Sequence, residues 1–214
     1  PSQFKQELAD GKPPIPLFKQ AGNHAQAVMD EHFREHKDAI ALVHARSWFM
    51  DELLLCAWDL YFPQDAHNIC LLAVGGYGRG ELLPNSDIDL LILIERANAQ
   101  HHSSNIQSFL ALLWDIGLEV GHSVRSVKES LHQATHDVTV MTALLDARAI
   151  CGTPYLLQQL CLKLRSKTGW KTKSFFQAKY AEQQDRHAKS NHTRFANRWC
   201  ANVCMLEHVF KLAD

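Results

Sequence analysis

Residues 71–90 read LLAVGGYGRGELLPNSDIDL, and this stretch decides the fold. It opens on the end of a wholly apolar run, residues 69–74, which has the length and composition of a buried strand. Four glycines follow within six residues, and a second apolar run, rich in Ile and Leu, covers residues 87–94. We therefore expect two buried strands joined by a glycine-rich turn.

A glycine-rich turn directly after a strand is typical of a loop that holds phosphate, because glycine lets backbone N–H groups approach an anion closely. A P-loop is excluded, since no Lys-Ser or Lys-Thr follows these glycines. A dinucleotide-binding fold is excluded as well. It needs a full crossover helix before the next strand, whereas only about a dozen residues separate the two runs and Pro84 interrupts them.

Asp87 and Asp89 stand two residues apart at the start of the second run. Because strand side chains alternate between faces, both carboxylates point one way, while Ile88 and Leu90 point the other. Two carboxylates beside a phosphate loop suit Mg²⁺ or Mn²⁺, which can bridge nucleotide phosphates during phosphoryl or nucleotidyl transfer. The alternative is a simple turn at Ser86-Asp87 with Asp89 solvated. The apolar strand that follows favours the metal site.

Composition excludes several classes of protein. The chain of 214 residues has 22 Lys and Arg against 23 Asp and Glu, a formal charge of −1. That balance argues against binding of bulk nucleic acid and against a polybasic membrane module. The six cysteines lie mostly in apolar surroundings, as reduced thiols of a cytoplasmic protein do. We expect a cytoplasmic protein without a nucleic-acid or membrane partner.

Five segments follow from the pattern of apolar residues and breakers. Residues 1–22, with Pro13, Pro14 and Pro16 and two glycines, are interpreted as an extended arm, and residues 23–66 as a long helical segment. Residues 67–150 form the core, with a helix at 101–117 and a third strand at 118–127. A helical extension, residues 151–190, and an atypical tail, residues 191–214, complete the chain. The fold class is α/β (α+β), a small sheet with flanking helices and helical extensions at both ends.

The central stretch resembles a known family. Gly75-Gly76 followed by Asp87-Ile88-Asp89 is similar to the nucleotidyltransferase superfamily that includes DNA polymerase β. More narrowly, residues 75–91 resemble the bacterial PII uridylyltransferase/uridylyl-removing enzymes, and the resemblance continues through residues 113–125 and 142–148. It implies a nucleotidyltransferase-like fold with a small mixed sheet.

The resemblance also implies an activity: in-line transfer of UMP from UTP to a tyrosine hydroxyl of the PII nitrogen-regulatory protein, with Mg²⁺ or Mn²⁺ and release of pyrophosphate. Asp87 and Asp89 are the implied metal ligands and catalytic residues. The implied triphosphate-binding residues are Gly75, Gly76, Gly78, Arg79 and Ser86. For Arg79, a salt bridge to Glu81 or a solvated position is an equal alternative.

The superfamily usually has a third carboxylate on a later strand, and our candidate is Glu119, in the expected third strand. A surface strand residue is the alternative interpretation. Asp137 and Asp146 fall in expected helices and are weaker choices, and Asp146 with Arg148 favours a structural cap or pair. His136-Asp137 lacks the flanking residues of a His-Asp hydrolase.

The last segment departs from the family pattern. Residues 191–214 lack its usual continuation, so we expect a truncated chain without the hydrolase and glutamine-sensing domains. Two alternatives to uridylyl transfer remain open at this point. One is a catalytically silent nucleotide-binding or interaction module, and the other is a related transferase with another nucleotide or acceptor.

Overall fold

The computed structural model describes residues 2–62, 68–84, 86–95, 99–167 and 172–190. The expectations for the tail, residues 191–214, lie outside this part of the chain.

A four-stranded mixed sheet forms the centre of the molecule, in the order β3-β2-β1-β4. The strands are β1 (Ile69–Ala73), β2 (Ile88–Ile94), β3 (Val120–Arg125) and β4 (Arg148–Gly152). β1 pairs antiparallel with both β2 and β4, whereas β2 and β3 are parallel. The expected small mixed sheet is confirmed.

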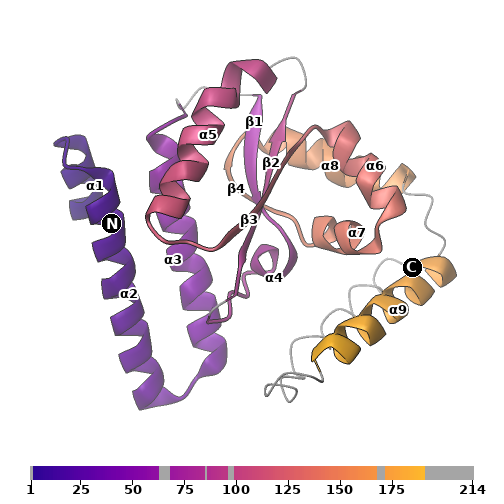
Figure 1. Ribbon diagram of the computed structural model, residues 1–214, viewed down its shortest axis with the longest axis horizontal. Coiled ribbons are helices and arrows are strands. Elements are labelled where there is room, and N and C mark those ends of the chain that lie inside the picture. Colours follow the sequence, from indigo (N-terminus) through magenta and orange to yellow (C-terminus); the bar gives the residue numbers. More distant parts are fainter. Residues whose placement is uncertain (1, 63–67, 85, 96–98, 168–171, 191–214) are drawn as a thin grey trace.

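Helices cover both faces of this sheet (Figure 1). Those that precede β3 are α1 (Ser2–Ala9), α2 (Pro14–His36), α3 (Ala39–Asp59), the single turn α4 (Gly75–Gly78) and α5 (Ala99–Asp115). Those that follow it are α6 (Val127–His136), α7 (Val138–Leu145), α8 (Pro154–Lys167) and α9 (Thr172–Ser190).

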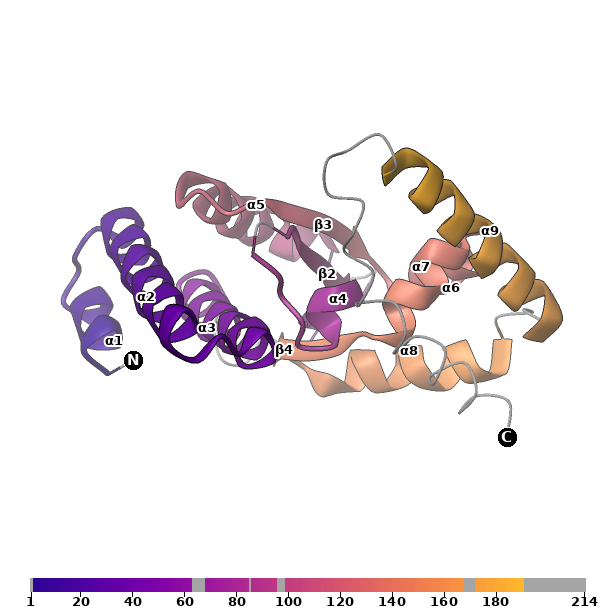
Figure 2. The same cartoon turned by 90° about the horizontal axis from the view of Figure 1, so that it is seen from below.

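The alternation of side chains along β1 and β2 divides the core into two clusters. Ile69 and Leu71 of β1 pack with α3 and α5, and Phe18 of α2 joins them. Cys70 and Leu72 point the other way and pack with α6, α7 and α8. Since both faces are covered, every residue of β1 is buried, which explains its unbroken apolar sequence. Figure 2 shows the two helical layers edge-on, with α9 against α6 and α7.

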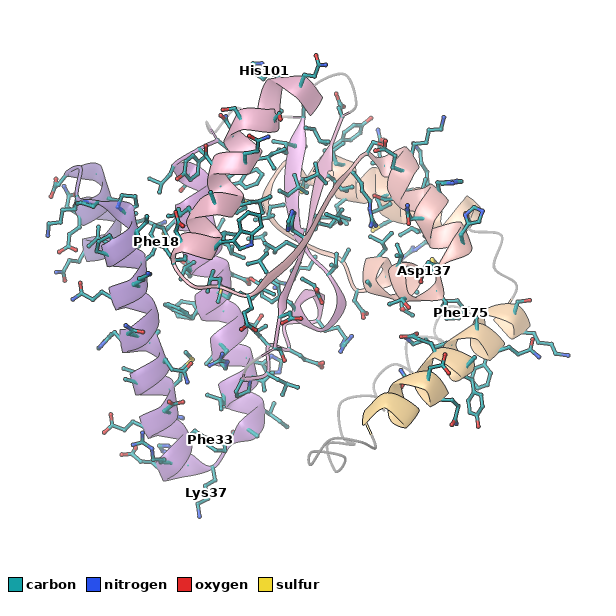
Figure 3. The ribbon with its side chains drawn as sticks, in the orientation of Figure 1. Phe18, Phe33, Lys37, His101, Asp137 and Phe175 are labelled. Atoms are coloured by element: carbon teal, nitrogen blue, oxygen red, sulfur yellow. The ribbon has the colours of Figure 1, made fainter. Side chains whose placement is uncertain are left out.

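The interpretation of residues 1–22 as an extended arm is wrong. Pro14 and Pro16 lie in the first turn of α2, where a missing N–H costs nothing, so the prolines mark the start of a helix. Phe18 is 1% exposed, and its ring meets Phe4 of α1 edge-on at 5.0 Å. The segment thus contributes to the core, as the inward position of Phe18 in Figure 3 illustrates.

The expected long helical segment is two antiparallel helices. Lys37 ends α2 in the left-handed conformation, with φ 54°. Asp38 then caps α3, and its carboxylate accepts hydrogen bonds from the amides of Ile40 at 3.1 Å and Ala41 at 3.0 Å. The chain reverses between α2 and α3 at Lys37 (Figure 3). Apolar periodicity continues across such a reversal and does not reveal it.

The three expected strands and the helix before the third are confirmed, with small shifts at their ends. Gly117 follows that helix with φ +89°. The fourth strand, β4, was not expected: residues 148–150 were assigned to the core without a strand, and residues 151–152 to the helical extension. β4 also crosses the limit expected between residues 150 and 151, and α8 packs on the same sheet. The five segment limits themselves remain predictions.

Candidate active site

The start of β2 presents two carboxylates to solvent. Asp87 and Asp89 are exposed, while Ile88 and Leu90 between and after them are buried in the core. The alternation agrees with the period of two from which the shared face was inferred. β2 begins at Ile88, so Asp87 lies just before the strand.

The neighbouring strand places two residues beside these carboxylates. In the parallel register Ile88 is opposite Val120 and Asp89 is opposite Gly121, so one residue earlier Asp87 comes beside Glu119. The amide of Ile88 donates to the carbonyl of Glu119 at 2.9 Å. Glu119 precedes β3 and its side chain is exposed. The backbone therefore brings Glu119 to the same edge as Asp87 and Asp89.

Two glycines border the Asp89 carboxylate. A Cβ on Gly121 would lie 2.7 Å from Asp89 Oδ1, and a Cβ on Gly75 would lie 3.5 Å from Oδ2. Gly75 has φ +61°, a conformation that side chains other than glycine rarely adopt. The amide of Val74 donates to the carbonyl of Asp89 at 3.1 Å and ties the end of β1 to β2. Any larger residue at position 121 would occupy space that this carboxylate uses.

The glycine turn itself is the short helix α4. Its hydrogen bonds begin with the amide of Gly78 donating to Val74 and the amide of Arg79 donating to Gly75. The amides of Gly75 and Gly76 are the first of the turn and have no partner within it. Gly78 serves a different purpose: it is buried, and a Cβ there would lie 2.1 Å from the carbonyl oxygen of Asp146.

Arg79 is held by two carboxylates. Its Nη1 is 2.7 Å from Asp146 Oδ2, its Nε is 3.0 Å from Glu81 Oε2, and the side chain is 17% exposed. Burial lowers the pKa of Arg79, but the hydrogen bond and charge of Asp146, together with Glu81, raise it above its ordinary value. The salt-bridge interpretation of Arg79 is thus the observed one, with a second partner.

A second network, absent from the sequence predictions, joins the turn to α3 and β4. The Tyr77 hydroxyl donates to Asp51 at 2.6 Å, and Arg148 donates to both Asp51 oxygens. These residues are 26 and 97 positions from Asp51, so no local spacing identifies the group. Asp146 and Arg148 have the expected structural roles but do not pair with each other: Asp146 is the C-cap of α7 and pairs with Arg79, and Arg148 pairs with Asp51.

Two candidates from the sequence remain, one of which has a structural role while the other is exposed. Asp137 caps α7, accepting from the amides of Thr139 at 2.7 Å and Val140 at 3.3 Å, and it lies at the junction of α6 and α7 in Figure 3. Ser86 is exposed next to Asp87, and its amide donates to the carbonyl of Leu83.

The two carboxylates at the strand edge are suited to a divalent cation. Asp87 and Asp89 offer hard oxygen ligands, and the glycines on either side of Asp89 leave its carboxylate space. Among the described residues no group of three or more His, Cys, Asp or Glu side chains forms a metal site. The two aspartates alone leave most of an octahedral shell for phosphate oxygens and water.

Two hollows lie on the side of the sheet covered by α2 and α3. A cavity of about 410 Å³ is bordered by Gln26, Arg46 and Leu118, and one of about 380 Å³ by Val28, Trp48 and Cys56. Neither includes the aspartates. Within the described part of the chain, no helix has the length and apolar character required to cross a membrane.

Comparisons with known proteins agree with this geometry. Residues 23–123 match the DUF294 nucleotidyltransferase family. The bifunctional uridylyltransferase/uridylyl-removing enzyme of Pseudomonas syringae pv. syringae is 47% identical over 193 residues, 90% of this chain and 22% of that protein. The enzyme of the same name from Azotobacter vinelandii is 45% identical over 195 residues, 91% of this chain and 22% of that protein.

The match therefore covers most of this chain but only about a fifth of the length of these relatives. It includes the glycine turn, both aspartates and Glu119, which all lie inside the range matched by the family model. The resemblance inferred from the central motif is confirmed. Residues 23–123 thus match a nucleotidyltransferase family, and the chain is homologous to part of the bifunctional uridylyltransferase/uridylyl-removing enzymes.

Proposed function

We propose that this domain transfers UMP from UTP to a tyrosine hydroxyl of a PII signalling protein and releases pyrophosphate. The observation that carries the proposal is the exposed Asp87 and Asp89 pair at the edge of the sheet, directly beside the glycine turn. The names and identities of the relatives support the nucleotide and the reaction type.

Each group at the edge has a role in this proposal. Asp87 and Asp89 hold the divalent cation, Mg²⁺ or Mn²⁺, and Glu119 is the candidate third carboxylate. The amides of Gly75 and Gly76 bind the triphosphate. Ser86, which directly precedes Asp87, is a further candidate for binding it. Gly78 and Arg79 act indirectly, through their contacts with Asp146. When bound, the metal neutralises phosphate charge and stabilises the charge that develops during transfer.

The reaction replaces one bond at the α-phosphorus of UTP. The tyrosine oxygen attacks this phosphorus, the bond to the pyrophosphate oxygen breaks, and the hydroxyl proton is released. The two carboxylates, which carry negative charge themselves, need the cation in order to tolerate a triphosphate beside them. We place the reaction in the cytoplasm, in keeping with the free thiols of Cys56, Cys70, Cys151 and Cys161.

The test uses the whole chain with Mg²⁺, UTP labelled at the α-phosphate, and purified PII. Asp87→Asn and Asp89→Asn are each expected to lower label transfer more than about a hundredfold, because a metal ligand is lost. Both side chains are exposed, so the variants keep the circular dichroism and thermal midpoint of the wild type. Asp115→Asn, at the exposed end of α5, is the matched control. Transfer by the Asp87/Asp89 double variant would refute the assignment.

A second candidate function is nucleotide binding without transfer. The glycine turn beside the exposed aspartates can bind a nucleotide whether or not transfer follows. Calorimetry with UTP and Mg²⁺ distinguishes the two, because a silent binding module takes up UTP but releases no pyrophosphate when PII is added. A transferase with another nucleotide or acceptor is recognised by repeating the labelling with ATP, CTP and GTP.

A further inference from the structure

The Asp51 carboxylate of α3 joins three parts of the molecule that are distant in sequence. It accepts from the Tyr77 hydroxyl of α4 at 2.6 Å, through Oδ1. Arg148, the first residue of β4, donates from Nη1 to Oδ2 at 2.8 Å and from Nη2 to Oδ1 at 3.0 Å. Two parallel charge-assisted hydrogen bonds fix both the distance and the orientation of the guanidinium.

Arg148 also reaches the backbone of the glycine turn. Its Nε donates to the carbonyl of Gly78 and its Nη2 to the carbonyl of Tyr77, each at 3.3 Å. The guanidinium lies 5.5 Å from the centre of the Tyr77 ring. The Tyr77 carbonyl also accepts from the amide of Gly80 at 3.0 Å, so Arg148 adds a second donor there and supplies one to the Gly78 carbonyl at the end of α4.

The charge states keep this network intact at neutral pH. Burial raises the pKa of Tyr77, and the hydrogen bond to Asp51 raises it further, so the hydroxyl stays protonated and donates. Burial lowers the pKa of Arg148, but the hydrogen bonds and charge of Asp51 outweigh this effect and raise it overall. The guanidinium is therefore charged and already committed to a carboxylate.

The turn depends on such external contacts. Residues 75–80 contain four glycines, and glycine loses more backbone entropy on ordering than any other residue. The only side chains in this hexapeptide are Tyr77 and Arg79, and both are held by carboxylates outside it, Asp51 and Asp146. These contacts at the far end of the turn act together with the Val74–Asp89 backbone hydrogen bond at its near end in holding Gly75 next to Asp89.

We propose that Asp51, Tyr77 and Arg148 are positioning residues that hold the Gly75–Gly78 turn where its amides receive the triphosphate of UTP. The inference rests on the proposed function and extends it to three residues that never touch the nucleotide. Its consequence is that α3 and β4, outside the glycine motif and the aspartate pair, set the affinity for nucleotide.

Three conservative variants of the full chain test this role: Arg148→Lys, Asp51→Asn and Tyr77→Phe. Arg148→Lys keeps the charge but cannot form the two parallel bonds. The matched controls change the same residue types at exposed sites: Arg165→Lys on α8, Asp115→Asn on α5 and Tyr180→Phe on α9. Amide hydrogen exchange reports on the turn without nucleotide, and steady-state kinetics with UTP, Mg²⁺ and PII report on the site.

For the three variants we expect faster amide exchange confined to residues 74–82. The KM for UTP should rise about tenfold or more, with a smaller change in kcat, as for other supporting groups around an active site. In the double variant Asp51→Asn/Arg148→Lys, the KM for UTP should rise only as much as in the more strongly affected single variant, because the two residues act through one network. The controls should behave as the wild type.

Two results would overturn the inference. One is exchange in residues 74–82 that equals the wild type in folded variants, which would mean that the turn holds itself. The other is faster exchange with an unchanged KM for UTP, which would make the network purely structural. A wild-type chain that transfers no label is a failure of the proposed function instead, and the exchange data still decide whether the network holds the turn.

Discussion

Gly121 of β3 lies directly opposite Asp89 of β2, and a Cβ on Gly121 would lie 2.7 Å from the Asp89 carboxylate oxygen Oδ1. The contact is with the end of a side chain and not with backbone, so the side chain can yield. A methyl group at position 121 therefore moves the carboxylate without breaking the sheet.

This relationship predicts the effect of Gly121→Ala. We expect kcat for label transfer to fall about tenfold or more, because a ligand displaced by a fraction of an ångström no longer fits the reacting geometry. The free energy of unfolding in urea should change little. Ser123→Ala, two residues further along the same strand, is the control. Wild-type kcat in Gly121→Ala would show that the position of Asp89 is not critical.

Glu119→Gln tests the third carboxylate. The parallel register brings Glu119 beside Asp87, and its exposed side chain is free to turn toward the edge. If it supports metal binding, the Mg²⁺ concentration for half-maximal transfer should rise about tenfold, with the KM for UTP at saturating Mg²⁺ less affected. A Mg²⁺ titration identical to the wild type would leave Glu119 as a surface residue.

The sheet was largely predictable because its central strands have a clear physical pattern. β1 is buried on both faces, so it has an unbroken apolar sequence, and β2 begins with an alternation of acidic and apolar residues. β4 has no such pattern. It starts with Arg148, ends with Gly152 and is only half-buried, so nothing in its composition distinguishes it from a loop. The helix start at Pro14 was not predicted, because proline occurs both in the first turn of a helix and just after the end of one.

The two aspartates of the site were predictable for the same reason: a period of two is a local property of the chain. The network around Asp51 was not. Its members are separated by 26, 71 and 97 positions, and they meet only because α3, α4 and β4 pack together. Pairing of Arg79 with Glu81 was foreseeable from their spacing, whereas its partner Asp146 comes from a distant segment.

Gly78→Ala tests the packing of the glycine turn. A Cβ at position 78 would lie 2.1 Å from the backbone oxygen of Asp146, which cannot move aside as a side chain can. We expect the free energy of unfolding to fall by about 3 kcal/mol. Gly22→Ala is the matched control, because its Cβ would meet nothing within 4 Å and the site is inside α2, where alanine is favoured by up to about 1 kcal/mol. Equal stability of both variants would contradict the contact.

Asp137→Ala tests the assignment of Asp137 as a helix cap and not a catalytic acid. Its carboxylate accepts from two amides in the first turn of α7. Loss of that cap should lower the free energy of unfolding by about 1 kcal/mol and leave the KM for UTP unchanged. Asp115→Ala, at the end of α5, should change neither quantity by as much. A large loss of kcat with unchanged stability would instead indicate that Asp137 is part of the active site.

Because the Cys70 thiol is buried, we expect the protein to lose stability at alkaline pH. The thiol is fully buried in β1, and burial raises its pKa from 9.0 to about 12. Above pH 9 the unfolded chain therefore releases this proton while the folded chain keeps it. The contribution to stability is complete below pH 9 and is lost as the pH rises toward 12.

Between about pH 8 and pH 10.5, the free energy of unfolding should decline less steeply in Cys70→Ala than in the wild type, although the variant is less stable throughout. Identical slopes, or alkylation of Cys70 by iodoacetamide in the native protein near neutral pH, would contradict the buried, protonated thiol.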